Sequence, residues 1–143
     1  MTVPKEGRTS FVSNHKLLLY CLFSLAFIGT TYYYLDDRKQ VYEIQWIVMS
    51  IVWYSSIGFS ITKIICKSKI GYLVAGIISW MTLAVWLLDN YYVVFHVTII
   101  ATRPDDIMII RNFIGVAVSS LGILSAHNAF HKISYVQKSK PRI

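Results

Sequence analysis

The sequence contains little of what reactive or metal-binding chemistry needs. Only two of its 143 residues are cysteines, and its seven acidic residues are half as many as its fourteen lysines and arginines. It has no glycine-rich phosphate loop, nucleophile elbow or zinc-protease motif, and no paired carboxylates inside an apolar run. We therefore expect a non-catalytic protein, with no catalytic residues, no metal site and no cofactor.

Hydrophobic residues dominate what the sequence does contain. They make up 55% of the chain and give a mean hydropathy of +0.52, above what soluble domains of this size show. Four apolar stretches, at 17–35, 44–62, 70–88 and about 107–126, each approach the roughly twenty residues with which a helix crosses a bilayer. The sequence predicts an all-α membrane protein, a bundle of four transmembrane helices over 17–131.

The basic residues divide unequally between the two ends of such a bundle. With four crossings, ten lie on the side of the termini and of the connection between helices two and three, and four lie on the other side. The positive-inside rule then places both termini, the basic segment 1–16 and the basic tail 132–143, on the cytoplasmic or matrix side. The inner group is Lys5, Arg8, Lys16, Lys63, Lys67, Lys69, Lys132, Lys138, Lys140 and Arg142, and the outer group is Arg38, Lys39, Arg103 and Arg111.

This charge distribution also bears on partners and location. Short basic segments beside a membrane attract anionic lipid headgroups, whereas a nucleic-acid site needs one folded basic surface, so no nucleic-acid partner is expected. The first apolar stretch has no Ala-x-Ala-like cleavage site around Gly29 and continues through Tyr34, so we expect a retained helix. The prediction is a multi-pass integral membrane protein, with an endomembrane of the ER type favoured over the mitochondrial inner membrane.

Aromatic residues gather at the predicted outer level, where their amphipathic rings can lie among headgroups. This group is Tyr32, Tyr33, Tyr34, Tyr42, Trp46, Tyr91 and Tyr92. Tyr54 is different, because it lies near the middle of helix two and its hydroxyl needs a polar partner there. A Ser or Thr on a neighbouring helix could supply one.

Helix four carries small residues at spacings of four, three and four. Without bulky side chains two helix backbones can approach closely, and packing is the main attraction between helices in lipid. We therefore predict that this stripe is buried against another helix, within the chain or outside it. The stripe consists of Gly115, Ser119, Gly122 and Ala126.

Asp89 and Arg111 are the charged residues closest to the predicted hydrocarbon. One ends helix three and the other begins helix four, so both lie at the outer boundary on two legs of one hairpin. An ion pair between them would lower the cost of either charge alone. There are two alternatives: each side chain extends to the headgroups on its own, or the two residues take part in ion coupling. A transport site would more typically have several polar groups near the midplane, and the sequence shows no such cluster.

The apolar outer hairpin 89–110 contains the stretch YYVVFHVTIIA at 91–101, which is too short to cross a bilayer and too apolar for a solvent loop. Thr102 as N-cap and Pro104 in the first turn predict that the second leg extends helix four. The first leg could be a helix extension, an interfacial segment or a strand, so the end of helix three stays open between Leu88 and Ala101. Either a partner protein or the headgroup zone covers it, and we favour the partner. The predicted partner-binding residues are Tyr91, Val94, Phe95 and Ile99.

Histidine and cysteine residues lie at the predicted inner end. His127 and His131 stand one turn apart, a spacing that can chelate a metal, but interfacial or structural histidines are the simpler interpretation. Cys66 lies beside the membrane between Ile65 and Lys67 and is a candidate for S-acylation, with an unmodified thiol as the alternative.

These features favour a non-catalytic accessory, scaffolding or assembly subunit of a larger membrane protein complex, whose partners are other integral membrane proteins. Its small size, short loops, packing stripe and apolar outer segment support this interpretation. The alternative is a small oligomeric transporter or channel in which Asp89 and Arg111 line a path. A lipid-handling protein ranks third, because no acid, base or metal constellation can be assembled.

Overall fold

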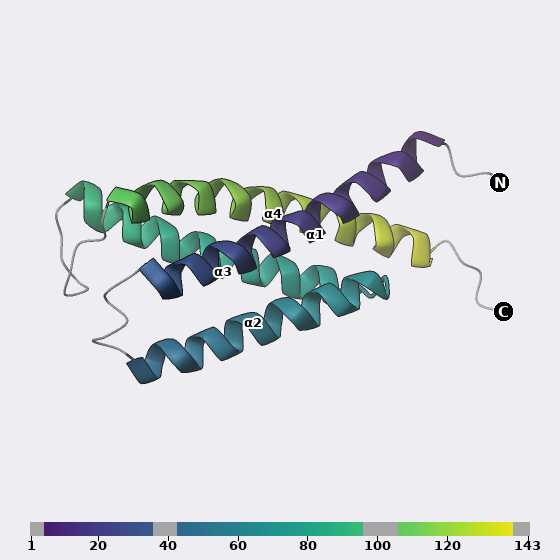
Figure 1. Cartoon of the computed structure of the whole chain (residues 1–143). Helices are drawn as coiled ribbons and strands as arrows, with labels where there is room; N and C mark the ends of the chain where they lie inside the picture. Colours follow the sequence, from purple (N-terminus) through teal and green to yellow (C-terminus); the bar gives the residue numbers. More distant parts are fainter. Residues whose placement is uncertain (1–4, 36–42, 96–105, 139–143) are drawn as a thin grey trace.

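Four helices make up the computed structural model, which describes residues 5–35, 43–95 and 106–138. They are α1 (Lys5–Leu35), α2 (Glu43–Ile65), α3 (Lys69–Phe95) and α4 (Asp106–Lys138). Consecutive helices run in opposite directions, so the start of α1 and the end of α4 lie at the same end of the molecule (Figure 1). We call this the inner end and the opposite one the outer end. The predicted helical bundle is confirmed.

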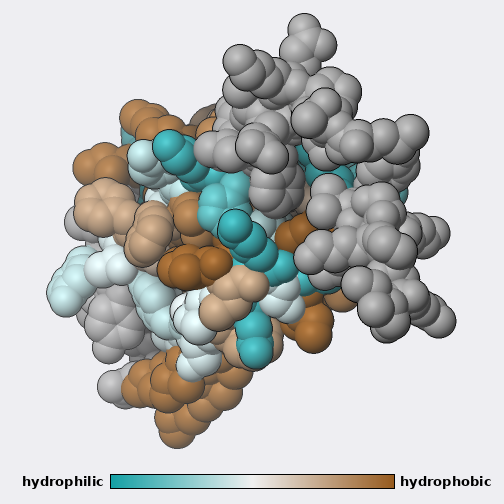
Figure 2. All heavy atoms as spheres, turned by 90° about the vertical axis from the view of Figure 1, so that its right-hand side faces the viewer, coloured by the Kyte–Doolittle hydropathy of each residue, from teal (hydrophilic) through white to brown (hydrophobic). Residues whose placement is uncertain are grey.

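Three of the helices contain a stretch long and apolar enough to cross a membrane. These stretches are Ile47–Ile65 in α2, Lys69–Tyr91 in α3 and Ile109–Ser134 in α4. The crossing predicted for α1, and the side of the membrane on which each terminus lies, stay predictions. Figure 2 looks at the inner end and shows hydrophilic side chains near its middle, with hydrophobic ones among them and along the edge.

All four helices extend beyond the ranges expected from the sequence, α2 only by one residue at its start and three at its end. α3 continues past Leu88 to Phe95, so the first five residues of the apolar outer stretch are helical. Its β-branched residues have a modest helix propensity, but a helix satisfies every backbone group of an apolar segment internally. α1 begins at Lys5, inside the predicted basic segment 1–16, and α4 continues past 131 to Lys138.

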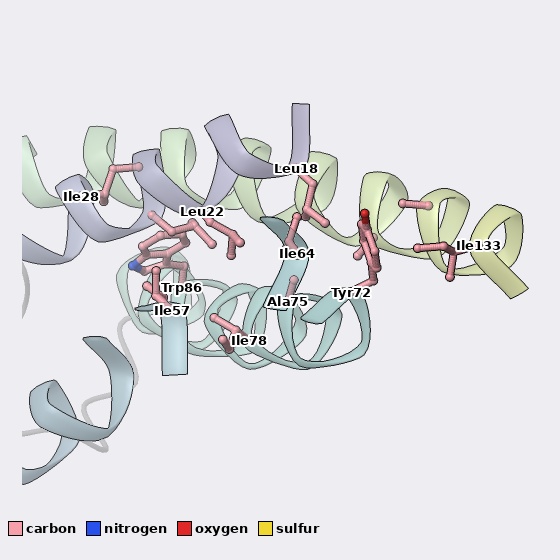
Figure 3. Packing of buried hydrophobic residues seen from close by; sticks show 13 residues of the cluster. Leu18, Leu22, Ile28, Ile57, Ile64, Tyr72, Ala75, Ile78, Trp86 and Ile133 are labelled. Carbon is pink, nitrogen blue, oxygen red and sulfur yellow. The ribbon is translucent and has the colours of Figure 1, made fainter. Parts of the chain in front are cut away.

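The core is a seam between α3 and α4, with α1 packed over it. Buried residues recur on both helices at alternating spacings of three and four, which is the period of two helices packed along their length. On α3 they are Tyr72, Ala75, Ser79, Thr82, Trp86 and Asp89, and on α4 they are Asn112, Gly115, Ser119, Gly122, Ala126, Ala129 and Ile133. Leu18, Leu22 and Leu25 of α1 are fully buried against this pair (Figure 3).

The turn between α2 and α3 joins these helices tightly at the inner end. Lys67 has a left-handed backbone with φ of 54°, and the Ser68 N–H donates to the Lys63 carbonyl at 2.9 Å, as in a Schellman cap. A Cβ atom on Gly71 would lie 2.6 Å from the backbone nitrogen of Ile64, so glycine permits this close approach. The buried Ser60 hydroxyl also donates to the Gly71 carbonyl at 2.9 Å. From this attachment α2 diverges from α3 toward the outer end (Figure 1).

Candidate functional site in the seam and on the face of α2

The outer end of the seam holds a chain of buried polar side chains. The Arg111 Nη2 donates to Asn112 Oδ1 at 2.7 Å, and the Asn112 Nδ2 donates to Asp89 Oδ2 at 2.9 Å. Asn112 is fully buried, and Asp89 and Arg111 are only 5% and 7% exposed. The neutral Asn112 amide thus connects an anionic residue of α3 to a cationic residue of α4.

Asp89 and Arg111 therefore lie in one cluster of side chains with Asn112. The direct ion pair stays a prediction, because the hydrogen bonds described run through Asn112. Both charges lie within candidate membrane spans, near the outer ends of those spans, where a hydrogen-bonded partner reduces the cost of burial. The arrangement can hold α3 and α4 together at this level.

Asn112 is a site residue that the sequence interpretation missed. It lies three residues before Gly115, so it continues the small-residue stripe of α4 by one further step of the same spacing. Extending that stripe toward the start of the helix would have placed Asn112 on the seam beside Asp89.

The small residues of α4 lie against α3. A Cβ atom on Gly115 would overlap the ring of Trp86, and a Cβ atom on Gly122 would lie 2.6 Å from the Ser79 Oγ. Ala126 Cβ is in ordinary contact, 3.6 Å from the Cβ position of Gly76. The partner that the sequence left open is therefore a helix of the same chain. Ser119 is also buried in this interface.

The inner end of the seam holds a second polar contact. The Nδ1 of His15 on α1 lies 2.8 Å from the hydroxyl of Tyr72, which is buried on α3. Burial, and secondarily the positive charge of Lys67, lower the pKa of His15, which favours the neutral imidazole. This contact joins α1 to the seam.

Tyr54 of α2 has the polar partner that the sequence predicted. Its hydroxyl lies 2.9 Å from the Thr30 Oγ1 on α1, which confirms that a hydroxyl residue of a neighbouring helix satisfies it. A Cβ atom on Gly29 would lie 3.3 Å from Trp53 Nε1 and 3.4 Å from the Tyr54 hydroxyl. Gly29 thus lets the large side chains of α2 approach α1.

Two histidines and one cysteine at the inner end are exposed, and a second cysteine is buried as a free thiol. His127 and His131 are exposed, with their ring centroids 4.4 Å apart and the rings edge to face. In the part of the chain that the structure describes, no group of three His, Cys, Asp or Glu residues could hold a metal ion. Cys66 is an exposed free thiol after the last turn of α2, and Cys21 is a buried free thiol. S-acylation of Cys66 stays a prediction.

The predicted partner-binding residues of the outer segment are only partly described. Tyr91 lies in α3 and is 48% exposed. Val94 and Phe95 belong to the last turn of α3, with side chains outside the described set. Ile99 lies outside the described residues, so a partner surface there stays a prediction.

A second stripe of small residues lies on the outward face of α2. Its three small members, Ser55, Gly58 and Thr62, are exposed at spacings of three and four, and the exposed Ile51 and Ile65 continue the same row at its two ends. A Cβ atom on Gly58 would have no described atom within 4 Å. Of the apolar span of α2 only 17% is buried within the protein, against 39% for α3 and for α4. This face of α2 is therefore uncovered by the described chain.

No protein-family model, no curated protein and no solved structure matches this chain.

Proposed function

We propose that the protein is a multi-pass membrane protein that acts as a non-catalytic accessory or assembly subunit of a larger membrane complex. In this role α2 packs against a transmembrane helix of another integral membrane protein. The seam between α3 and α4, with α1 over it, is the rigid scaffold that presents α2.

The observation that carries this proposal is the uncovered small-residue face of α2. Ser55, Gly58 and Thr62 form a shallow strip between larger apolar residues, and the space above Gly58 is open. Lipid tails solvate any apolar surface, but close backbone packing is the main attraction between helices in a bilayer, and small residues permit it. Within the same chain, the small residues of α4 are used for such packing against α3.

The orientation and lipid contacts of this subunit follow from its charges. We place both termini on the cytoplasmic or matrix side, where basic residues such as the exposed Lys16 and Lys67 contact anionic headgroups. The apolar outer segment that begins at Tyr91 provides a further contact for the partner. The organelle we favour is an endomembrane of the ER type.

The test is the native mass of the tagged full-length chain in its own membrane, extracted in mild detergent, with mass spectrometry of the proteins that co-migrate. Gly58→Leu should release the partner without affecting the scaffold, because the added side chain enters open space. Ala84→Leu, on the exposed face of α3, is the matched control and should keep the partner. A wild-type monomer would contradict the accessory role, and equal co-purification by both variants would contradict the assignment to α2.

A second candidate function is a small oligomeric transporter or channel. The buried charges of Asp89 and Arg111, inside candidate spans, favour it, because charged residues within a membrane mark ion or proton paths as well as structural clamps. Under this proposal Asp89→Asn changes ion flux in reconstituted vesicles and leaves the native mass unchanged. Wild-type vesicles without flux of protons, sodium, potassium or chloride would contradict it.

A further inference from the structure

The middle of the seam contains hydroxyl groups at the level where a membrane is driest. Ser79 lies ten residues after the start and twelve before the end of the span Lys69–Tyr91, so it is near the centre of α3. Gly122, which contacts it, is similarly central in the span Ile109–Ser134 of α4. The sequence showed no polar cluster near the midplane, because these residues lie on two helices and meet only in the fold.

Ser79 and Ser119 differ from five other hydroxyl residues of the four helices. These five donate to the carbonyl four residues earlier in their own helix: Thr30, Ser56, Thr62, Thr82 and Ser120. Ser79 and Ser119 are fully buried, and neither hydroxyl bonds to another group in the described part of the chain. A hydroxyl that is buried in an apolar region without a hydrogen bond is costly, so both require a partner.

The two hydroxyls are close enough to share one partner. Ser79 Oγ lies 2.6 Å from the position that a Cβ atom of Gly122 would take. Ser119 precedes Gly122 by three residues on the same stripe, and the Cβ positions of such neighbours are about 5–6 Å apart. A single water molecule spans about 5.5 Å through two hydrogen bonds of about 2.8 Å.

The register of α3 against α4 places a third hydroxyl residue opposite Ser119. The two helices are antiparallel, and Trp86 lies against Gly115 while Ser79 lies against Gly122. This register places Thr82, which is midway between the two α3 residues, opposite Ser119. Thr82 donates its proton to the Ile78 carbonyl at 2.7 Å, so its oxygen still has a lone pair that can accept.

We propose that Ser79, Thr82 and Ser119 bind an ordered water molecule at the centre of the seam. Water fits this site because buried waters typically make about three hydrogen bonds to groups that have no other partner. Gly122 is required, because a Cβ atom there would lie 2.6 Å from the Ser79 Oγ and push that hydroxyl out of place. The bound water joins α3 to α4 at mid-span, where the two serine hydroxyls do not bond to each other directly. This inference concerns the interior of the scaffold and is independent of the proposed partner on α2.

The first test is a double-mutant cycle on the full-length chain in detergent micelles. Ser79→Ala and Ser119→Ala should each raise the unfolding equilibrium constant about threefold to tenfold. The double variant should raise it no further than one single variant, because both remove the same bridge. Ser120→Ala, which removes only a bond to its own helix, is the control and should add independently to either variant. The proposal would be overturned if either single variant left the protein as stable as the wild type or made it more stable. It would also be overturned if the effects of the two substitutions on stability simply added in the double variant.

The second test requires no variant to fold. In the wild-type protein in micelles, magnetisation transfer from water to the amide and hydroxyl protons of residues 79 and 119 should be observed by NMR. The amide of Ser120, on the neighbouring face of α4, is the reference for general water penetration. Transfer at residues 79 and 119 above that reference supports the site. If the double-mutant cycle shows that the two serines are coupled but no such transfer is observed, the two hydroxyls bond directly to each other. That result would overturn the water site.

Discussion

α4 and α2 each carry a stripe of small residues at the spacing of a packed helix, but only the α4 stripe is covered within the chain. On α4, the ring of Trp86 occupies the surface of Gly115, and the hydroxyl of Ser79 contacts the position beside Gly122. On α2, Gly58 faces open space. The same sequence pattern is therefore covered by a helix of the chain in one place and left uncovered by the described chain in the other.

The difference arises from what stands opposite each stripe. The α3 side of the seam presents Trp86 and Ser79, which lie against Gly115 and Gly122 of α4. α2 contacts its neighbours through its inner turn and through Trp53 and Tyr54, and these contacts lie on other faces of the helix. No helix of the described chain covers the open face of α2.

The largest expected effect comes from filling the covered stripe. Gly115→Leu should destabilise the protein by about 3 kcal/mol, because the new side chain overlaps the Trp86 ring in a fully packed interface. Gly58→Leu is the matched substitution on the open stripe and should leave the intrinsic stability unchanged within about 0.5 kcal/mol. Denaturant unfolding of the purified chain in micelles measures both. If both variants changed the free energy of unfolding by the same amount, the two stripes would not differ in how tightly they are packed.

The next largest effect concerns the hydrogen-bonded residues Asp89, Asn112 and Arg111 at the outer end of the seam. Asn112→Ala should destabilise by about 2 kcal/mol, because it removes two buried hydrogen bonds to charged groups. Asn128→Ala, at an exposed position on the same helix, is the control and should cost no more than a few tenths of a kcal/mol. The same unfolding measurement applies. A neutral Asn112→Ala would mean that Asp89 and Arg111 are held without the amide.

Part of this comparison could be predicted from the sequence alone. Hydropathy gave the helical bundle, and the spacing of Gly115, Ser119, Gly122 and Ala126 predicted a buried face of α4, which the structure places against α3. The need of Tyr54 for a hydroxyl partner was also readable, because a phenol at mid-helix in an apolar span has few other options. Local chemistry determines each of these features.

The rest depends on which helices meet. The α3 seam mixes tyrosine, alanine, serine, threonine, tryptophan and aspartate, so no single residue type marks it in the sequence. The three midspan hydroxyls converge only through the antiparallel register of α3 and α4. The left-handed Lys67 was also missed, because a Schellman cap is usually signalled by glycine or asparagine at that position.

A smaller effect, which should stabilise the protein, is expected from a substitution in the turn that joins α2 to α3. Lys67→Gly should stabilise the protein by about 1 kcal/mol, because glycine adopts the left-handed backbone without the steric cost that a Cβ atom imposes. Lys67→Ala removes the same charge but keeps the Cβ atom, so it separates backbone strain from electrostatics. Equal stability of the Gly and Ala variants would show that the backbone of this turn stores no such strain.

The smallest expected effect tests the contact of α2 with α1. Tyr54→Phe removes the hydrogen bond to Thr30 and should cost about 0.6 kcal/mol, the typical value for a hydrogen bond between helices in a membrane protein. Combining it with Thr30→Val in a double-mutant cycle isolates the bond, since Thr30 also donates to the Ala26 carbonyl. Tyr20→Phe, at a position 69% exposed on α1, is the control for loss of a phenol hydroxyl at the surface. A coupling energy of zero between residues 54 and 30 would mean that this hydrogen bond adds nothing to the packing of α2 on α1, which would then rest on contacts such as that of Trp53 with Gly29.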